Sequence, residues 1–321
     1  MSKRLRFALV GAGHMGKFHA QAIAERSDTQ LVAVCDVDAS RAAKMAADFG
    51  ARVETDVRRL AGEVDAAVIA AATTVHRDVA TVLLARGTAV LIEKPLAATA
   101  AEARQIADAA RCSSAVAQVG HILRFDPVTR AVAGRIGKPG FVEVSWAAPF
   151  SARSMDVGVV MDLVIHGLDL VLWMAGEAPS RVDAVGGRVI GPHEDFVSVR
   201  LAFPGGCVVN LTASRLSRTR QRQVRVFSGD AYLKMDYGAR TVERMTPRPG
   251  LAEMVRSNPA VGMEQLFTAE KLPVEDKPDG LRAQLASFIG AVRGEHPPAV
   301  TLEEGARAVE VAEEIVRQVR A

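Results

Sequence analysis

Uninterrupted apolar runs alternate with alanine-rich segments along the first 120 residues of the chain. The runs occupy residues 7–10, 31–35, 66–71, 89–92 and 116–119. The alanine-rich segments, whose composition favours helix, occupy residues 15–25, 40–49, 76–86 and 100–110. Strands that are buried on both faces lack the alternation of apolar and polar residues. This order therefore predicts an α/β fold with a doubly wound parallel sheet, the Rossmann arrangement.

The rest of the chain has shorter segments that are separated by turn residues. Pro204–Gly206 and Ser228–Asp230 each lie between two β-type segments, which predicts two hairpins. Residues 251–278 show no clear periodicity and predict a long excursion. Asp162 is the expected N-cap of one helix. Helices are expected at residues 127–136, 163–175, 281–292 and 302–319.

The length of 321 residues supports two domains. We expect residues 1–121 to hold the parallel sheet and residues 122–321 to form an α+β domain with an open, mostly antiparallel sheet. Basic and acidic side chains are nearly balanced, 40 against 37, which argues against nucleic acid as a partner. No apolar run approaches the roughly 20 residues of a membrane helix, and residues 7–12 are too short for a secretion signal. The three cysteines are odd in number and widely spaced, so we expect no disulfide framework and a cytoplasmic location.

A glycine-rich turn links the first predicted strand to the first predicted helix. Gly11, Gly13 and Gly16 form a G-x-G-x-x-G pattern, with His14 and Met15 before the last glycine. In this context Gly11 permits a tight turn, Gly13 lets a pyrophosphate approach the backbone, and Gly16 lets the helix pack on the strand. Free N–H groups at the helix N-terminus attract the phosphates. The pattern predicts a dinucleotide cofactor, and an ordinary strand-to-helix turn is the alternative.

An acidic residue ends the second predicted strand. Asp36 lies 20 residues after Gly16, where a carboxylate accepts hydrogen bonds from both ribose hydroxyls and repels a 2′-phosphate. The spacing therefore favours NAD over NADP as the cofactor. Capping of the following helix is the alternative role for Asp36.

The fifth predicted strand leads directly into Glu93, Lys94 and Pro95. Ligands of doubly wound sheets bind beyond the carboxyl ends of the strands, so we expect Glu93 and Lys94 beside the nicotinamide end of the cofactor. A lysine at this place is able to donate a hydrogen bond to a substrate oxygen or to take part in proton transfer. A solvated strand end is the alternative.

Three titratable residues share one predicted helix. Asp162, His166 and Asp169 are spaced i, i+4 and i+7, which places them on one helix face with apolar residues opposite. A histidine beside carboxylates is suited to take a hydroxyl proton while hydride leaves the same carbon. The spacing also resembles a set of metal ligands, but no further ligand clusters nearby, so no metal is expected. A structural histidine is the alternative.

Four motifs occur in order along essentially the whole chain. They are GAGHMGKFHA at the start, EKP at 93–95, GHILRFDP at 120–127 and DLVIHGLD at 162–169. Together they resemble the Gfo/Idh/MocA oxidoreductases, nicotinamide-dependent dehydrogenases of sugars and polyols. The resemblance implies that Lys94, Asp162 and His166 are the catalytic residues and that the Lys94–Pro95 bond is cis. It also implies an open sheet that packs against another subunit, in a homodimer or homotetramer.

Three further segments indicate a narrower branch of this family. They are VGHILRFDP, residues 149–170, and SRLSRTRQRQVRVF followed by YLKMDY. These segments are similar to the UDP-N-acetylglucosamine 3-dehydrogenases, which oxidise the sugar C3 hydroxyl before transamination on a bacterial route to lipid A. The similarity implies a UDP-sugar substrate and functional coupling to an aminotransferase. The family pattern commonly reads RFNP where this chain reads RFDP, so Asp126 replaces an asparagine. It commonly reads HDID where this chain reads HGLD, so Gly167 replaces an aspartate.

A UDP-sugar carries two phosphates, which forked guanidinium groups bind well. Arg124 and Arg153 lie in segments that flank the proposed active site, and His121 is expected with Arg124 in the sugar pocket. A basic run extends from Arg215 to Arg225, and a strand there would place three arginines on one face: Arg218, Arg220 and Arg222. A solvated or ion-paired face, or a subunit contact, is the alternative for each arginine.

These residues predict NAD-dependent oxidation of a secondary sugar hydroxyl to a ketone. His166 is the expected base and Lys94 the donor to the reacting oxygen, or the two roles are exchanged, while Asp162 orients the imidazole or the substrate. Three other functions stay open: dehydrogenation of a cyclitol or simple monosaccharide, reduction of an imine or C=C bond, and NAD sensing by a non-catalytic regulator. The complete set of Lys94, Asp162 and His166 argues against the regulator.

Overall fold

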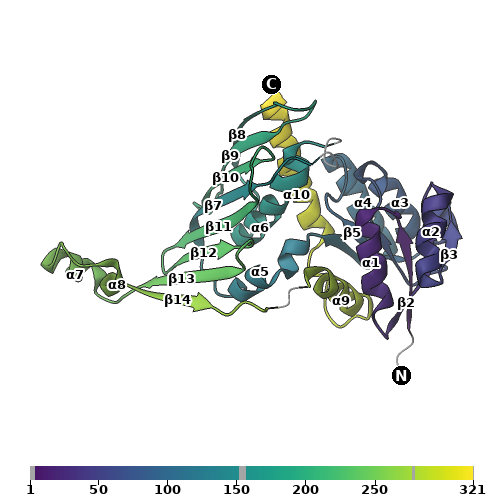
Figure 1. Ribbon diagram of the computed structural model, residues 1–321, viewed down its shortest axis with the longest axis horizontal. Coiled ribbons are helices and arrows are strands. Elements are labelled where there is room, and N and C mark those ends of the chain that lie inside the picture. The colour runs from purple at the N-terminus through teal and green to yellow at the C-terminus, as the bar shows by residue number, and fades with distance from the viewer. Residues whose placement is uncertain (1–3, 152–156, 277–278, 321) are drawn as a thin grey trace. The chain divides into compact units, whose positions relative to one another are not determined.

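The computed structural model describes residues 4–151, 157–276 and 279–320 (Figure 1). The chain forms two compact units, each defined by contacts among its own residues. Unit 1 consists of Met1–Phe125 and Asp279–Glu313, and unit 2 consists of Asp126–Pro278 and Glu314–Ala321. The division after Phe125 lies close to the expected boundary at residue 121. Residues 279–313, which the sequence analysis assigned to the second domain, pack with unit 1.

The described part of unit 1 contains a six-stranded parallel sheet with the order β3-β2-β1-β4-β5-β6. Its strands are β1 (Leu5–Val10), β2 (Thr29–Cys35), β3 (Arg52–Glu54), β4 (Ala66–Ile69), β5 (Ala89–Glu93) and β6 (Ala117–Gly120). This is the doubly wound sheet that the apolar runs predicted, with β3 as an additional short strand. The strand order reverses between β1 and β4, and the crevice at such a switch point is where ligands bind.

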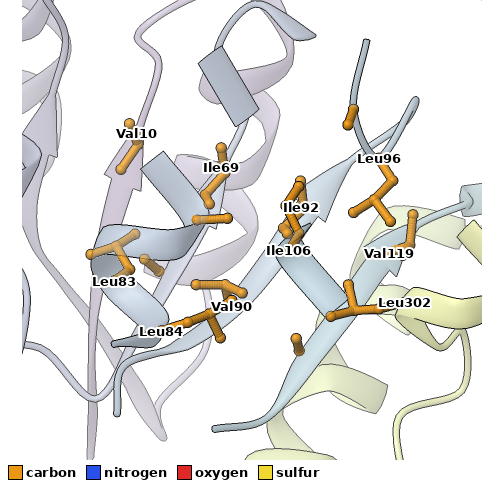
Figure 2. Close-up of a cluster of buried hydrophobic side chains, with 14 of the residues drawn as sticks. Val10, Ile69, Leu83, Leu84, Val90, Ile92, Leu96, Ile106, Val119 and Leu302 are labelled. Carbon is orange, nitrogen blue, oxygen red and sulfur yellow. The ribbon is translucent and has the colours of Figure 1, made fainter. Parts of the chain in front are cut away.

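Helices cover both faces of this sheet. One face is covered by α1 (His14–Ala24), α2 (Ala39–Phe49) and α9 (Gly280–Val292), and the other by α3 (His76–Leu84), α4 (Ala100–Ser113) and the first part of α10 (Leu302–Arg320). Successive residues of β1 point to opposite faces, so Phe7 and Leu9 lie in one apolar cluster and Ala8 and Val10 in the other. Figure 2 shows the second cluster, in which α3, α4 and α10 pack on the strands. Burial of these clusters holds the carboxyl ends of the strands in place.

The described part of unit 2 contains an eight-stranded sheet with the order β14-β13-β12-β11-β7-β10-β9-β8. Its strands are β7 (Pro139–Ala147), β8 (Arg181–Gly187), β9 (Phe196–Ala202), β10 (Val208–Ser214), β11 (Gln221–Ser228), β12 (Tyr232–Asp236), β13 (Thr241–Pro247) and β14 (Phe267–Leu272). Both predicted hairpins are present, β9 with β10 and β11 with β12. The β7–β10 pair is parallel and the other described pairs are antiparallel. The mostly antiparallel α+β arrangement is confirmed.

The described helices of unit 2 are α5 (Pro127–Val132), a π-helical turn at Val160–Val164, α6 (Ile165–Ala175), α7 (Leu251–Ser257), α8 (Met263–Leu266) and the end of α10 from Glu314. The expected excursion at 251–278 contains α7, α8 and β14, and Figure 1 shows α7 and α8 beyond the ends of β13 and β14. Val144 and Leu211 of the sheet contact α6 at Gly167. None of the helices in the described ranges is long and apolar enough to cross a membrane.

Candidate active site

The glycine-rich turn after β1 is closely packed on one side and open on the other. A Cβ on Gly11, whose φ is +101°, would lie 2.6 Å from the backbone of Ala70, and a Cβ on Gly16 would overlap the Gly11 carbonyl oxygen. A Cβ on Gly13, in contrast, would meet no atom within 4 Å. The turn therefore excludes side chains where it packs and leaves the backbone at Gly13 accessible, which fits the approach of a pyrophosphate.

Helix α1 presents an uncapped N-terminus beside this turn. Gly13 is its N-cap, and within the described residues no side chain caps it and no acidic residue lies in its first turn. The first N–H groups of α1 are therefore available to an anion, and the helix dipole favours negative charge there. His14 and Met15 are exposed in this first turn, as the predicted cofactor contacts require.

Asp36 follows β2 and joins the glycine-rich turn to the next helix. Its Oδ2 accepts a hydrogen bond from the Ala12 N–H at 2.8 Å, and its Oδ1 accepts from the Asp38 N–H at 2.9 Å and from Arg41 at 3.0 Å. A carboxylate offers about four acceptor sites, so Oδ2 retains capacity for a ribose hydroxyl. The N-cap of α2 is Asp38 and not Asp36, which rules out the capping alternative.

The Glu93-Lys94-Pro95 segment continues from the end of β5. The Lys94–Pro95 peptide bond is cis, as the family resemblance implied. Lys94 is half-buried, whereas Glu93 is buried, with His19 Nε2 2.7 Å from its Oε1 and the Lys94 N–H donating to its Oε2 at 3.2 Å. These contacts occupy both oxygens of Glu93 from within unit 1, so direct contact of Glu93 with the cofactor stays a prediction.

His121 and Arg124 follow β6 in unit 1. His121 is 1% exposed, and Arg124 lies in the short 3₁₀ helix Ile122–Phe125 with its side chain 7% exposed. Arg124 forms an ion pair with Glu304 of α10 at 2.9 Å. Burial opposes ionisation of Glu304, but the Thr301 N–H and Arg124 outweigh it and lower the pKa of this carboxyl. The ion pair anchors Arg124 inside unit 1, and sugar binding by His121 and Arg124 stays a prediction.

Asp162 and His166 lie where the predicted helix begins with a π-helical turn. Asp162 is inside the π-helical turn Val160–Val164, so the expectation that it caps the helix is wrong. Such turns occur frequently at functional sites. Asp162 and His166 are half-buried, whereas Asp169 is only 2% exposed. Unit 2 thus keeps Asp162 and His166 accessible and places Asp169 in the interior.

A tryptophan that the sequence analysis did not select packs directly against this helix. Trp146 of β7 is 3% exposed, and a Cβ on Gly167 would overlap its Nε1. The rings of Trp146 and Tyr237 lie 5.5 Å apart, and the Tyr237 hydroxyl is 2.8 Å from Thr129 Oγ1 of α5. Gly167 therefore allows Trp146 to pack beside His166. The alternating apolar residues of 139–147, which include Val142, Val144 and Trp146, were the available signal for this strand.

The basic run separates into arginines with different surroundings. Strand β11 begins at Gln221, so Arg218 and Arg220 precede it and the expectation that they share a strand face with Arg222 is wrong. Arg222 pairs with Trp146 across the sheet, and its guanidinium carbon lies 5.8 Å from the centre of the Trp146 ring. Arg225 points to the opposite face and pairs with Glu143 at 3.4 Å.

Arg222 also interacts electrostatically with the carboxylates around it. Burial, together with the charge of Arg220, lowers the pKa of Arg222, while Asp162 and Asp126 act in the opposite direction. Asp126 caps α5, where its carboxyl accepts from the Val128 N–H. Burial raises the pKa of Asp126, and this effect is only partly offset by that N–H and by Arg240 and Arg222.

Arg215 is not available to a ligand in the way the basic run suggested. Its side chain is 4% exposed and forms an ion pair with the buried Asp195 at 2.6 Å, and it donates to the Val157 carbonyl oxygen at 3.0 Å. Burial opposes ionisation of Asp195, but the N–H groups of Ile190 and Val189 and the Arg215 guanidinium hold its pKa at about 2. This cluster therefore holds the chain that leads into the π-helical turn.

Arg153 lies outside the described residues. Within the described ranges, no group of histidine, cysteine, aspartate and glutamate side chains is arranged to hold a metal ion. The three cysteines are free thiols, buried at Cys35 and Cys207 and exposed at Cys112.

Comparisons with known proteins agree with the two units. Residues 5–121 match the family model described as "Oxidoreductase family, NAD-binding Rossmann fold", and residues 129–233 match the "GFO/IDH/MocA C-terminal domain". The chain is 35% identical over 295 residues to a UDP-N-acetylglucosamine 3-dehydrogenase of Acidithiobacillus ferrooxidans, covering 91% of this chain and 90% of the relative. A crystal structure of that enzyme superimposes with a TM-score of 0.90 and 32% identity, covering 99% of this chain and 98% of the other. An inositol 2-dehydrogenase of Rhizobium meliloti is 34% identical over 210 residues, covering 61% of this chain and 63% of the relative.

A glycine-rich turn that is open at Gly13 and an acidic residue after β2, together with the family match of residues 5–121, define an NAD-binding oxidoreductase. The chain belongs to the Gfo/Idh/MocA family of oxidoreductases.

Proposed function

We propose that this protein oxidises the C3 hydroxyl of UDP-N-acetylglucosamine to a ketone with NAD as cofactor. The observation that carries the proposal is the 35% identity to the Acidithiobacillus ferrooxidans 3-dehydrogenase over 91% of the chain. The two family motifs keep Lys94, Asp162 and His166 in this chain, although the second departs from the common pattern at Gly167. Oxidation of an amino-sugar carbon to a ketone prepares it for transamination, so an aminotransferase is the proposed cytoplasmic partner on a route to lipid A.

Each side chain has a role in this proposal that follows from its chemistry. His166 accepts the hydroxyl proton through Nε2, because its Nδ1 is buried. Lys94 donates a hydrogen bond to the same oxygen while negative charge develops there. Asp162 orients the imidazole or the sugar. Bound NAD supplies the acceptor for the hydride that leaves C3 with its electron pair. Replacing His166 with Asn and Lys94 with Met, and comparing the pH profiles of kcat, separates the base from the donor.

Arg222, on the α6 face of the unit 2 sheet, and its neighbour Arg220 support a nucleotide-sugar substrate. Arg222 lies on the Trp146 ring, and Arg220 is near enough to influence its ionisation. Two neighbouring guanidinium groups suit a diphosphate, which carries two negative charges. In this proposal Arg222 and Arg220 bind the diphosphate of the substrate, and Arg153 stays a proposed contact of the same kind.

The diphosphate assignment is tested with a pair of matched variants. Arg222→Gln should raise the KM for UDP-N-acetylglucosamine by about tenfold or more, because it removes a charged hydrogen-bond donor. Arg225→Gln is the control, since Arg225 lies on the opposite sheet face and pairs with Glu143. Equal effects of the two variants would contradict the assignment.

Oxidation of a cyclitol is the second candidate, and the similarity to the Rhizobium meliloti inositol 2-dehydrogenase favours it. The deciding experiment follows the absorbance of NADH with UDP-N-acetylglucosamine or myo-inositol as substrate. The nucleotide sugar is tested with and without an aminotransferase and glutamate, because removal of the ketone pulls the reaction forward. NADH formed from inositol alone would refute the nucleotide-sugar proposal.

A second copy of the chain is the proposed structural partner. The face of the unit 2 sheet opposite α6 carries Phe227, 38% exposed, with Phe141 and Tyr232 beside it at ring-centre distances of 5.6 and 4.8 Å. Association through this aromatic group would give the homodimer or homotetramer. Light scattering should show a smaller particle for Phe227→Asp than for the wild-type protein, and an unchanged mass would contradict this contact.

A further inference from the structure

Two buried histidines approach the Glu93–Leu96 segment from opposite faces of the unit 1 sheet. His19 belongs to α1, which packs in the cluster with Phe7 and Leu91. His76 begins α3, which packs in the other cluster, and Figure 2 shows Ile92 and Leu96 there. Their exposed fractions are 0% for His19 and 1% for His76. Neither histidine has a role in the reaction proposed above.

His19 fixes the residue before Lys94. Its Nε2 donates to Glu93 Oε1 at 2.7 Å, and Glu93 Oε2 accepts the Lys94 N–H at 3.2 Å. The Glu93 carboxyl is also confined by β6, because a Cβ on Gly120 would lie 3.3 Å from Glu93 Cδ. A buried carboxylate is stable only when its charge is hydrogen-bonded, so removing His19 frees Glu93 to seek another donor.

His76 fixes the residues after Lys94. Its Nδ1 lies 3.0 Å from the Pro95 carbonyl oxygen and 3.3 Å from that of Leu96, and its Nε2 lies 3.2 Å from the Ala71 carbonyl oxygen. Ala71 follows β4, next to Ala70, against which Gly11 packs. His76 therefore links the segment after Lys94 to the strand end that supports the glycine-rich turn.

We propose that His19 and His76 are positioning residues that hold the peptide on both sides of Lys94 and so fix the place of its amine. This inference rests on the role proposed for Lys94. Groups that act on a reacting atom must be held within about 0.5 Å of their productive place, which requires that the backbone carrying them is itself held by the groups around it. The two histidines hold this backbone from α1 and from the start of α3, and α1 also borders the glycine-rich turn.

Conservative and disruptive variants test this positioning. His19→Gln and His76→Asn keep a donor near the position of Nε2 and Nδ1, whereas His19→Met and His76→Leu remove it. With saturating NAD, each disruptive variant should lower kcat by about tenfold or more and change the sugar KM less than threefold, and each conservative variant should recover most of kcat. The double disruptive variant should cost little more than the worse single one, because both act on the same lysine.

Matched controls separate positioning from loss of stability. Ile23→Ala lies on α1 and Leu83→Ala on α3, both at fully buried sites. These controls should lower the melting temperature as much as the histidine variants do and leave kcat within about twofold. A kcat that follows the melting temperature across all variants would overturn the inference.

A second readout needs no substrate. Acetylation of the Lys94 amine, measured by mass spectrometry against the exposed Lys17 of α1, should change at least about threefold in His19→Met and His76→Leu. Unchanged labelling in both variants would overturn the inference even if the wild-type enzyme acts on another alcohol. If the wild-type enzyme does not turn over UDP-N-acetylglucosamine but the labelling changes in the variants, only the proposed substrate would be refuted.

Discussion

A single methyl group added beside the proposed base should disturb α6 strongly. In Gly167→Ala the new Cβ would overlap Trp146 Nε1 and lie 2.9 Å from Val144 Cγ1 and 3.0 Å from Leu211 Cδ1. None of these neighbours is the free end of a flexible chain, because all three side chains are buried in the sheet. The helix or the indole must therefore move.

Two opposing effects set the size of the change. Alanine in place of glycine inside a helix ordinarily stabilises by about 0.5–1 kcal/mol. Overpacking of a filled core costs about 1–3 kcal/mol, and three close contacts place Gly167→Ala in the upper part of that range. We expect a net loss of about 1–2 kcal/mol in the free energy of unfolding of unit 2. Because His166 precedes Gly167, kcat should fall by about tenfold as well.

Urea unfolding followed by tryptophan fluorescence, together with steady-state kinetics, measures both quantities. A double-mutant cycle with Trp146→Phe tests the cause, since phenylalanine lacks the Nε1 edge that the new methyl group meets. The double variant should be at least about 1 kcal/mol more stable than the sum of the single changes predicts. A more stable Gly167→Ala protein, or additive effects in the cycle, would refute the reasoning.

Two substitutions and one labelling experiment test other parts of the chain. Asp36→Ser releases Arg41 from its ion pair with Asp36. The ratio of kcat/KM for NAD to that for NADP should therefore shift about a hundredfold toward NADP, which corresponds to about 2.8 kcal/mol. An unchanged ratio would contradict the role of Asp36. Asp195 has a pKa of about 2, below its ordinary value near 4, so the stability it contributes, about 2–3 kcal/mol, is complete above about pH 4 and is lost as the pH falls to about 2. In Asp195→Asn, urea titrations should show lower stability at neutral pH and a shallower loss in acid, and an acid profile parallel to the wild type would count against it. A thiol reagent near neutral pH should modify Cys112 alone, because burial raises the pKa of both other thiols, in one case to about 11; rapid labelling of more than one cysteine in mass spectra would argue against this burial.

The parallel sheet of unit 1 could be predicted from sequence because its signals are local. Residues 66–69 and 89–92 are apolar without alternation, and the intervening segment is long enough for a crossover helix. Gly11 and Asp36 lie at fixed distances from strand ends, so their contacts with the next element were also predictable.

Contacts that join distant segments could not be predicted in this way. The π-helical turn that contains Asp162 begins where Glu194, far along the chain, accepts the Val160 N–H with its side chain and the Val159 N–H with its backbone carbonyl oxygen. Residues 279–313 read as ordinary amphipathic helices, and their apolar faces do not reveal that Phe288 packs on Phe7. The sequence pattern gives the faces of such elements and leaves their partners undetermined.

The two departures from the common family pattern are connected through one side chain. Gly167 provides the space that Trp146 fills, and Arg222 lies on the ring of that tryptophan. Asp126 replaces an asparagine of the pattern with a carboxyl group, and Arg222 is one of the cations that favour its ionised form. Replacing Gly167 alone with the common residue would therefore create an overlap with Trp146. Replacing Asp126 alone would remove one carboxylate near Arg222. Because Arg222 is also the proposed contact of the diphosphate, we expect that a change of substrate in this protein requires replacement of this connected group as a whole.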